Sequence, residues 1–343
     1  MAPGQDLAYP SSTCLLNGPK LGARDGRYKT VKTFRWVLAL TAATMVAAAM
    51  SPAPAAPPEG APNCELFPAR NHWNRRVDRL PRHPRSRDIV ATVGRQATLH
   101  PDFGSGTWNG GPIGIPYTTV PGDQPRVPVA FGYDDESDPG PYPIPPNAPV
   151  EGGPDADGDR HVIVVDRDEC TLYELFDARP QDGGARWTAG SGAVWDMNSN
   201  KLRPKGWTSA DAAGLPILPG LVRYEEVASG VIDHALRFTV SRTRRQYIYP
   251  ARHFASALTG RNLPAMGQRF RLKKSFDISS FPQQARVVLR ALKRYGMIVA
   301  DNGSDWFISG APHDDWDNDQ LRALKSVKGK HFVVVDTTKL ARP

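Results

Sequence analysis

Residues 187–240 contain most of the side chains in this chain that could do chemistry. Tryptophans, acids and one histidine are interspersed there with glycines and prolines: Trp187, Trp195, Asp196, Trp207, Asp211, Glu225, Glu226 and His234. A segment that only filled a core would not need this mixture. It is typical of irregular loops, carried on strands, that place polar groups beside aromatic rings, as in binding and catalytic sites.

His234 lies in a predicted strand, residues 232–240, on the same face as Leu236 and Phe238. One interpretation is a histidine at the edge of the core that is satisfied by a single hydrogen bond. The other starts from Glu225 and Glu226, which lie on a short helical turn that leads into this strand. A carboxylate beside a histidine can act in acid–base chemistry.

Two acids with separated pKa values would suit the hydrolysis of glycosidic bonds. The candidate acids are Asp196, Asp211, Glu225, Glu226 and Asp301. Spacing along the chain does not show which two of them meet. It therefore predicts a set of candidates and no specific pair.

Aromatic side chains could supply flat surfaces for sugar rings. The candidate platforms are Trp195, Trp207, Tyr247 and Tyr249, and we expect both tyrosines on one side of a strand at 246–250. Trp306 is a further candidate. The alternative is that at least half of these rings are buried in the core, as large aromatic residues usually are.

Asp155, Asp157 and Asp159, followed by Asp166, resemble the ligand spacing of a calcium loop. Position 6 of such a loop is glycine, but here it is Arg160, and the favoured interpretation is a solvated acidic turn. A structural calcium is the only cofactor considered. The sequence contains no HExxH, GxSxG or Walker motif, and no GxGxxG opens a helix after a strand.

The N-terminal region has the pattern of a secretory signal peptide. A basic segment, residues 27–35, precedes an apolar run at 36–50 and the small-residue pattern Ala53-Pro54-Ala55. The apolar run is shorter than the roughly 20 residues that a membrane span needs. We therefore expect a secreted protein that keeps no stable membrane span after cleavage.

Export also bears on the cysteines and the charge. Cleavage would remove Cys14 and leave Cys64 and Cys170, which predicts a disulfide in an oxidising compartment. The net charge of +8 would fall to +4, because residues 1–55 contain six basic and two acidic residues. So small an excess argues against a nucleic-acid partner.

Turn residues and short apolar runs predict a mainly β fold, a β-sandwich or jelly-roll-like domain with two surface helices; an α+β domain is the alternative. The predicted strands are 127–131, 161–166, 171–176, 193–197, 232–240, 246–250, 268–273, 297–300, 306–309 and 331–336. The strands at 161–166 and 171–176 flank a short turn, which predicts a hairpin. The helices are expected at 281–295, where Ala285, Val288, Leu289 and Leu292 form one apolar stripe, and from about 318 to before Gly329. We expect an N-terminal extension with signal peptide at 1–55, a Pro/Ala linker at 56–63 and one β-rich domain at 64–340, monomeric in solution.

Several phrases of the sequence resemble a family of exported bacterial proteins found near carbohydrate-related modules. They are HVIVVDRDECTLYELF, GWTSADAAGLPILPGLVRYEEV, IDHALRFT, PARH and YGMIVADNGSDWFISG. The resemblance runs from about Cys64 to Asp336 and implies one cooperative unit. It carries over no catalytic residue.

These observations predict a secreted carbohydrate-active protein that cleaves a polysaccharide, such as a glycoside hydrolase. Its cleft would be lined by residues 187–240 and closed by a loop at 133–153, with Glu225, Glu226 or Asp211 as acid and base and His234 orienting one of them. Its partner would be an extracellular glycan or cell-wall polymer. A glycan-binding protein without catalysis and a structural envelope protein are the alternatives.

Overall fold

The computed structural model describes residues 56–340 and 342, which belong to the compact unit Ser51–Pro343. The predicted signal peptide and Cys14 lie outside the described residues. Within the described part, no helix is both long and apolar enough to cross a bilayer.

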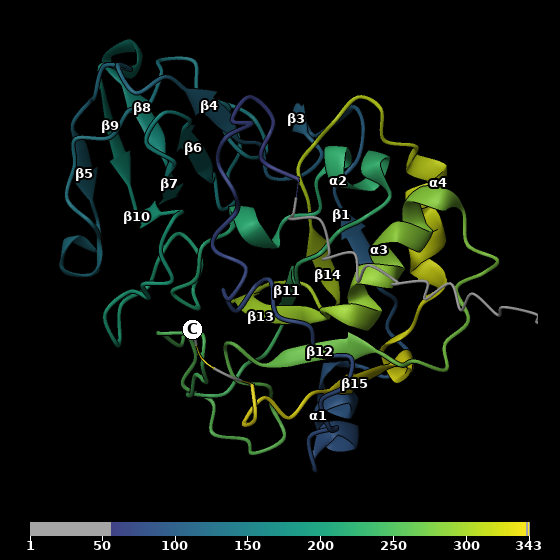
Figure 1. The fold of residues 1–343 in the computed structure, drawn as a ribbon. Helices are drawn as coiled ribbons and strands as arrows, with labels where there is room; N and C mark the ends of the chain where they lie inside the picture. The colour runs from purple at the N-terminus through teal and green to yellow at the C-terminus, as the bar shows by residue number, and fades with distance from the viewer. Residues whose placement is uncertain (1–55, 341, 343) are drawn as a thin grey trace, which may run out of the picture. The chain divides into compact units, whose positions relative to one another are not determined.

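A six-stranded mixed sheet forms one half of this unit (Figure 1). Its strands, in spatial order, are β1 (His100–Asp102), β14 (Phe307–Ser309), β11 (Leu236–Val240), β13 (Met297–Asn302), β12 (Arg269–Leu272) and β15 (Phe332–Val334). β11 pairs with β13 in parallel and with β14 antiparallel. The strands are rich in Val, Ile, Leu and Phe. β11 is buried along its whole length and β13 from Met297 to Ala300, which is typical of strands covered on both faces.

The other strands form a four-stranded sheet and two small ones. The four strands are, in spatial order, β10 (Ser191–Asp196), β7 (Thr171–Phe176), β6 (Val162–Asp166) and β4 (Thr118–Val120). The small sheets combine β5 (Val129–Phe131), β9 (Arg186–Ala189) and β8 (Arg179–Gln181), and β2 (Thr107–Trp108) with β3 (Gly111–Pro112). The predicted hairpin of 161–166 with 171–176 is present as β6 and β7.

The described residues include the α-helices α1 (Ser86–Val93), α2 (Tyr224–Ser229), α3 (Gln283–Arg294) and α4 (Asn318–Arg322). The predicted stripe on α3 is buried at all four positions. α4 is shorter than expected: it ends at Arg322 and continues as a 3-10 turn, Ala323–Ser326. Further 3-10 turns are Asp134–Glu136, Asp182–Gly184, Leu218–Gly220 and Gly329–His331.

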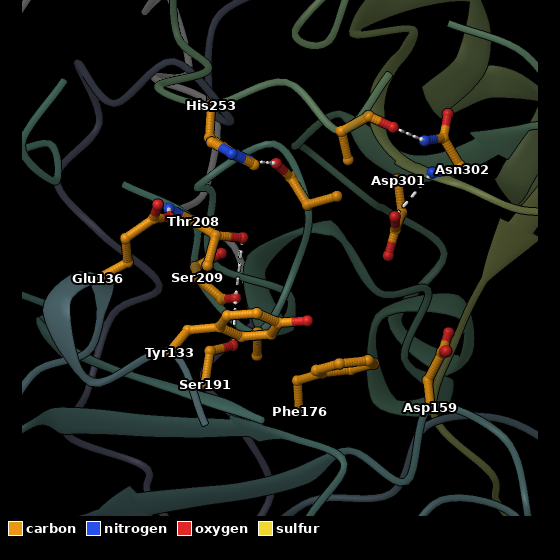
Figure 2. Close-up of a pocket in the computed structure, with 13 residues that line it drawn as sticks. Tyr133, Glu136, Asp159, Phe176, Ser191, Thr208, Ser209, His253, Asp301 and Asn302 are labelled. Atoms are coloured by element: carbon orange, nitrogen blue, oxygen red, sulfur yellow. Dashed lines mark hydrogen bonds between the residues drawn. The ribbon is translucent and has the colours of Figure 1, made fainter. Parts of the chain in front are cut away.

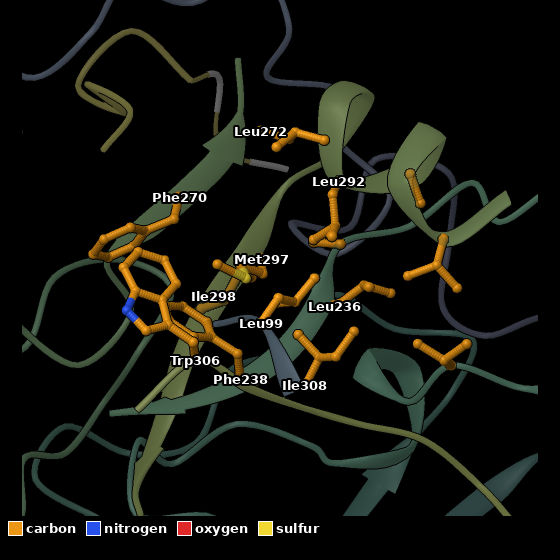
Figure 3. Packing of buried hydrophobic residues seen from close by; sticks show 14 of the residues in the cluster. Leu99, Leu236, Phe238, Phe270, Leu272, Leu292, Met297, Ile298, Trp306 and Ile308 are labelled. Atoms are coloured by element: carbon orange, nitrogen blue, oxygen red, sulfur yellow. The ribbon is translucent and has the colours of Figure 1, made fainter. Parts of the chain in front are cut away.

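The prediction of a mainly β fold with few helices is confirmed. The predicted strand at 246–250 is wrong: only Tyr247 makes a bridge, to Met266, and the Tyr249–Pro250 peptide bond is cis. The chain turns at the proline, so the two tyrosines do not share a strand face. The largest hydrophobic core packs α3 against the six-stranded sheet and includes the aromatic group Phe238, Phe270 and Trp306 (Figure 3).

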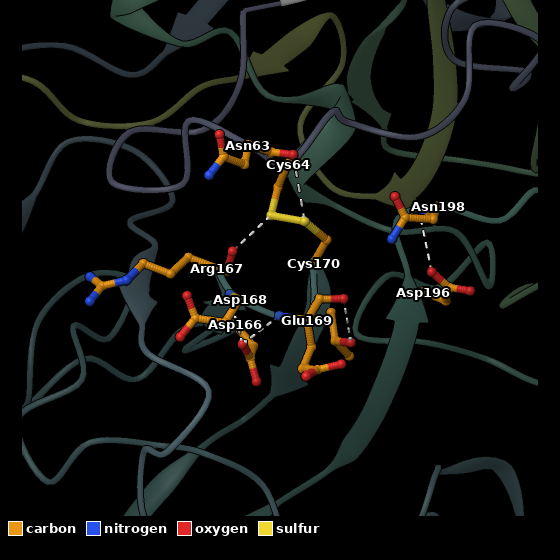
Figure 4. Close-up of a disulfide and its surroundings, with 10 residues drawn as sticks. Asn63, Cys64, Asp166, Arg167, Asp168, Glu169, Cys170, Asp196 and Asn198 are labelled. Carbon is orange, nitrogen blue, oxygen red and sulfur yellow. Dashed lines mark hydrogen bonds between the residues drawn. A yellow bond between two sulfur atoms is a disulfide. The ribbon is translucent and has the colours of Figure 1, made fainter.

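The predicted disulfide between Cys64 and Cys170 is confirmed (Figure 4). The two Cα atoms are 5.3 Å apart, within the normal range for a disulfide. Cys170 ends the turn between β6 and β7 and has a positive φ of 49°. The bond therefore ties the segment at the start of the described chain to the middle of the four-stranded sheet.

Candidate functional site

A cavity of about 350 Å³ brings together polar side chains from distant parts of the sequence (Figure 2). The residues lining it include Tyr133, Glu136, Asp159, Phe176, Ser191, Thr208, Ser209, His253, Asp301 and Asn302. Residues 191–212 supply one part of the wall, and the segment 133–136 supplies another. Both regions belong to the parts of the chain from which the sequence predicted a cleft.

Asp301 reaches this cavity because of an irregularity in the six-stranded sheet. Phe238 of β11 pairs with Val299 of β13, but the next residue, Thr239, pairs with Asp301, so Ala300 is an extra residue. Such a bulge changes the direction in which the following side chain points, and bulges are common beside active sites. The carbonyl oxygen of Ala300 accepts the N–H of Ala213 (2.9 Å), which joins the 208–213 loop to the same strand end.

The Asp301 carboxyl group has few hydrogen-bond partners. Oδ1 accepts the backbone N–H of Asn302 (2.7 Å), while Oδ2 lies 3.5 Å from Nη2 of Arg237. Arg237 is already paired with Asp211, to which Nε and Nη2 donate at 2.6 to 3.0 Å, and its Nη1 donates to Ser309 Oγ (2.6 Å). The guanidinium charge is therefore largely balanced by Asp211, and Asp301 is compensated only weakly.

This environment raises the pKa of Asp301 well above that of a free carboxyl group. Burial is the largest cause, and the negative charge of Asp211 is the second. Arg237 acts in the opposite direction, and Asp159, across the cavity, raises the pKa further. Because the side chain is still 17% exposed, the group can carry a proton and deliver it into the cavity.

His253 is the second group in the cavity that could move a proton. Its Nδ1 lies 2.8 Å from the carbonyl oxygen of Ala212, so Nδ1 must carry the hydrogen in the neutral ring. Nε2 makes no hydrogen bond within the described residues and stays available as an acceptor. His253 lies in the phrase PARH, and nothing in the sequence around it predicts a role; only its carbonyl partner and its place in the cavity identify it.

The hydroxyl groups of the cavity hold the loops together. Ser191 Oγ donates to the carbonyl oxygen of Ser209 (2.7 Å), and Ser209 Oγ contacts the carbonyl oxygen of Leu215 (2.6 Å). The Thr208 N–H donates to Glu136 Oε2 (2.8 Å), which fixes the 133–136 segment against this loop. None of these hydroxyls is hydrogen-bonded to His253, so the cavity lacks an activated serine or threonine nucleophile.

Glu226 and His234 meet, as their proximity in sequence suggested, but at a buried position outside this cavity. The Nε2 atom of His234 lies 3.1 Å from Glu226 Oε1, and Arg223 Nη2 donates to the same oxygen (2.6 Å). Burial opposes ionisation of Glu226, but Arg223 and then His234 outweigh it and lower its pKa. The predicted arrangement of these groups around an open cleft is therefore wrong, because both side chains are enclosed and paired with each other.

The other predicted acids lie apart from one another. Glu225 binds Arg223 Nη1 (3.0 Å) and Tyr117 (3.3 Å) on the outer side of the Glu226 cluster. Asp211 is fully buried beneath the cavity and does not line it. Asp196 is exposed and accepts the N–H of Asn198 (2.9 Å) near a different pocket. Of the six predicted catalytic residues, only Asp301 faces the cavity.

The predicted aromatic platforms do not line the cavity either. Arg203 lies over the rings of Trp195 and Trp207, at 5.7 and 5.4 Å from their centroids, so one face of each indole is already covered. Tyr247 stacks on Phe254, and Tyr249 lies under Arg342. The rings that do line the cavity are Tyr133, which is 55% exposed, and Phe176, which were not predicted to do so.

The acidic turn at 155–159 is not gathered into a cation site. In the described part of the chain, no three His, Cys, Asp or Glu side chains lie close enough together to hold a metal ion. The calcium interpretation of Asp155, Asp157 and Asp159 is therefore not supported, and Asp159 instead faces the cavity.

Comparison of the chain with family models, with curated proteins and with solved structures finds no match. The resemblance to exported bacterial proteins remains a prediction from sequence phrases. The chemistry of the cavity must therefore be inferred from its own geometry. That geometry offers one carboxyl group with a raised pKa, a second one in Asp159, and a third in Glu136, which already accepts the Thr208 N–H. It also offers one imidazole with a free nitrogen and two aromatic rings.

Proposed function

We propose that this chain is a secreted glycoside hydrolase in which Asp301 is the general acid. The observation that carries this proposal is the position of Asp301: it combines a raised pKa with access to a cavity that also holds a second carboxyl group, Asp159. Two carboxyl groups in different environments are what the hydrolysis of a glycosidic bond requires.

The proton transfer follows from the hydrogen bonds of Asp301. Oδ2 is the oxygen with the weaker contact, 3.5 Å from Arg237, and would carry the proton. As the glycosidic C–O bond breaks, this proton passes to the leaving oxygen. The carboxylate that forms is then stabilised by Arg237 and by the Asn302 N–H, which are already in place. A water molecule adds to the anomeric carbon, and its proton passes to the Asp159 carboxylate.

The remaining groups suit a ring with hydroxyl substituents. Tyr133 and Phe176 offer apolar ring surfaces to the carbon face of a sugar, while His253 Nε2 can accept a hydroxyl proton. The cavity falls within the size range of sites that enclose small ligands. We therefore infer a substrate that inserts one or two sugar residues here, from an extracellular glycan or a cell-wall polymer.

The secreted location is supported by two observations. The N-terminal residues have the pattern of a signal peptide, and the Cys64–Cys170 disulfide is of the kind that persists in oxidising compartments. Both are compatible with a substrate outside the cell.

Release of reducing ends from a panel of polysaccharides tests this function. Asp301→Asn should lower kcat at least about 100-fold, because general acid catalysis contributes about 10² to 10⁴. Asp196→Asn removes an exposed acid at a different pocket and should leave the rate unchanged. Full activity of Asp301→Asn would refute the assignment.

Other outcomes separate the alternatives. Binding to a glycan without any turnover would favour a non-catalytic binding protein that uses the same cavity. Absence of both binding and turnover would leave a structural envelope role. A rate that falls as the pH rises through the pKa of Asp301 would support the proton-donor role, because only the protonated acid can act.

A further inference from the structure

A second hollow, which we call the Trp108 groove, shares no lining residue with the cavity of Asp301. Its volume is about 660 Å³. It lies between the β2–β3 hairpin, the loop at Glu151 and Gly152, and the end of α4 at Arg322 with the following 3-10 turn, which contains Lys325. Nothing in the proposed hydrolysis uses this groove.

The hairpin that borders the groove is a tight and well-defined element. Asn109 and Gly110 join β2 to β3 and have φ values of 48° and 87°. Positive φ at both central residues is the signature of a type I′ turn, for which Asn-Gly is a preferred sequence. Trp108 pairs directly with Gly111, next to this turn. The backbone that carries Trp108 is therefore fixed by the turn itself.

The hairpin also packs against the loop at Glu151 and Gly152, which lines the groove as well. A Cβ atom on Gly111 would lie 2.0 Å from the carbonyl carbon of Gly152, a distance that no side chain could tolerate. Only glycine at this position allows the two backbones to approach so closely. The position of Trp108 relative to Glu151 is thus set by backbone packing.

The indole of Trp108 is 73% exposed, although its backbone is held firmly. By contrast, Trp73, Trp187, Trp195 and Trp306 are all buried. A large aromatic side chain that a rigid hairpin holds in solvent contributes little to the core. Such residues are the ones that commonly anchor a bound partner or ligand.

Two of the side chains that line the groove, His100 and Phe307, form an aromatic stack, which we call the floor of the groove. The rings of His100 and Phe307 stack at 4.0 Å with an angle of 4° between their planes. Burial, and then the charge of Lys325, lower the pKa of His100, so this ring is neutral at neutral pH. The floor and the Trp108 indole therefore offer two apolar aromatic surfaces at one site.

The charges that line the groove balance. Asp102 and Glu151 are its acids, and Arg322 and Lys325 are its bases. The side chains of Asp102 and Lys325 make no hydrogen bond to other described residues, and so they remain available to a ligand. With equal numbers of both signs, the groove offers no net attraction to a polyanion or a polycation.

We propose that the Trp108 groove binds a neutral oligosaccharide. The carbon face of one sugar ring would lie on the Trp108 indole, and its hydroxyl groups would donate to Asp102 and accept from Lys325. This site is separate from the proposed catalytic cavity and does not depend on its chemistry. It would hold a polysaccharide on the protein whether or not Asp301 cleaves it.

Binding of defined oligosaccharides to the secreted protein tests this proposal. Cellohexaose, xylohexaose and chitohexaose serve as neutral probes and trigalacturonate as an anionic one, all measured by calorimetry on an Asp301→Asn background that prevents turnover. In parallel, iodide quenching of tryptophan fluorescence reports mainly on Trp108, since the other indoles among the described residues are far less exposed. A bound sugar should protect Trp108 from iodide.

We expect at least one neutral oligosaccharide to bind and to reduce the quenching. Trp108→Ala should weaken its binding about tenfold, and Trp108→Tyr, which keeps a ring, should weaken it less. Leu258→Ala removes a comparable exposed apolar side chain elsewhere and should change nothing. The substitutions at Trp108 should leave the melting temperature unaltered because the indole is exposed.

Three results would overturn the proposal. The first is that none of the neutral probes binds at millimolar concentration. The second is that Trp108→Ala binds a neutral probe as tightly as the parent protein does, and the third is that trigalacturonate binds more tightly than every neutral probe. Loss of hydrolysis in Asp301→Asn is measured separately on the polysaccharide panel. The two proposals can therefore fail independently.

Discussion

Asp301→Asn should make the protein more stable at neutral and alkaline pH. The folded state raises the pKa of Asp301 from 3.8 to about 7, mainly because the side chain is buried. Between these two pKa values the carboxyl group ionises in the unfolded chain but keeps its proton in the folded one. The free energy of unfolding of the wild type therefore falls as the pH rises through this interval and stays low above it. Asparagine cannot ionise, so the variant escapes this loss.

The size of the effect follows from the same contacts. Each unit of pKa is worth about 1.4 kcal/mol, which sets an upper limit of about 4 kcal/mol for Asp301. The amide oxygen of Asn can still accept the N–H of Asn302, but the weak attraction between Asp301 and Arg237 is lost. We therefore expect a net gain of about 1 to 3 kcal/mol at pH 8, equivalent to about 2 to 8 °C in Tm. Below pH 4 the two proteins should be equally stable.

Urea unfolding of both proteins between pH 4 and pH 9 measures this difference. The gain in stability should appear between pH 4 and pH 7 and then remain constant. Asp196→Asn, which changes an exposed acid, is the control and should show no such dependence. A variant that is less stable than the wild type at pH 8, or equally stable at every pH, would show that Asp301 is an ordinary ionised carboxylate. The general-acid assignment would then lose its basis.

Two other substitutions test the parts of the structure that support the site. Replacing both Cys64 and Cys170 by alanine opens a loop of 106 residues and should lower the free energy of unfolding by about 2 to 5 kcal/mol. Urea unfolding should then show a lower midpoint. An unchanged midpoint would contradict a stabilising role of the disulfide. Glu226→Gln should lower the free energy of unfolding by about 3 kcal/mol, measured by thermal unfolding, because Arg223 and His234 lose their buried counter-charge. It should leave kcat of the folded protein unchanged. A loss of kcat at unchanged stability would instead return Glu226 to the catalytic site.

Local patterns in the sequence predicted much of the fold. Two apolar runs that flank a short turn, 161–166 and 171–176, predicted the hairpin of β6 and β7, and the spacing of Ala285 to Leu292 predicted the buried face of α3. These signals are local because a strand or helix repeats its environment at a fixed interval. The prediction of a strand at 246–250 was wrong because Tyr249 and Pro250 form a turn, and no periodic pattern reveals that turn.

The candidate site was less predictable because it depends on which segments meet. The sequence named Asp301 among five candidate acids but could not distinguish it from Glu226. Both are charged residues near apolar strands, and both occur beside a possible partner. The two acids differ in how well their charge is balanced. Glu226 is enclosed with Arg223, whereas Asp301 has only a weak contact with Arg237, because Arg237 binds Asp211 more closely. The two contacts differ by less than 1 Å, 2.6 Å to Asp211 against 3.5 Å to Asp301, and these acids lie 26 and 64 residues from Arg237 along the chain.

By itself, the sequence determined the mainly β class, the hairpin of β6 and β7, the buried stripe of α3 and the cysteine pairing. Each of these depends on composition, on a short repeat or on there being only two cysteines after residue 55. The tertiary structure alone decided that Asp301 and His253 share a cavity and that Trp108 stands exposed beside another. Those placements depend on a bulge in β13 and on glycine contacts between distant loops. Neither feature leaves a periodic mark in the chain, because each requires two separate segments to be close in space.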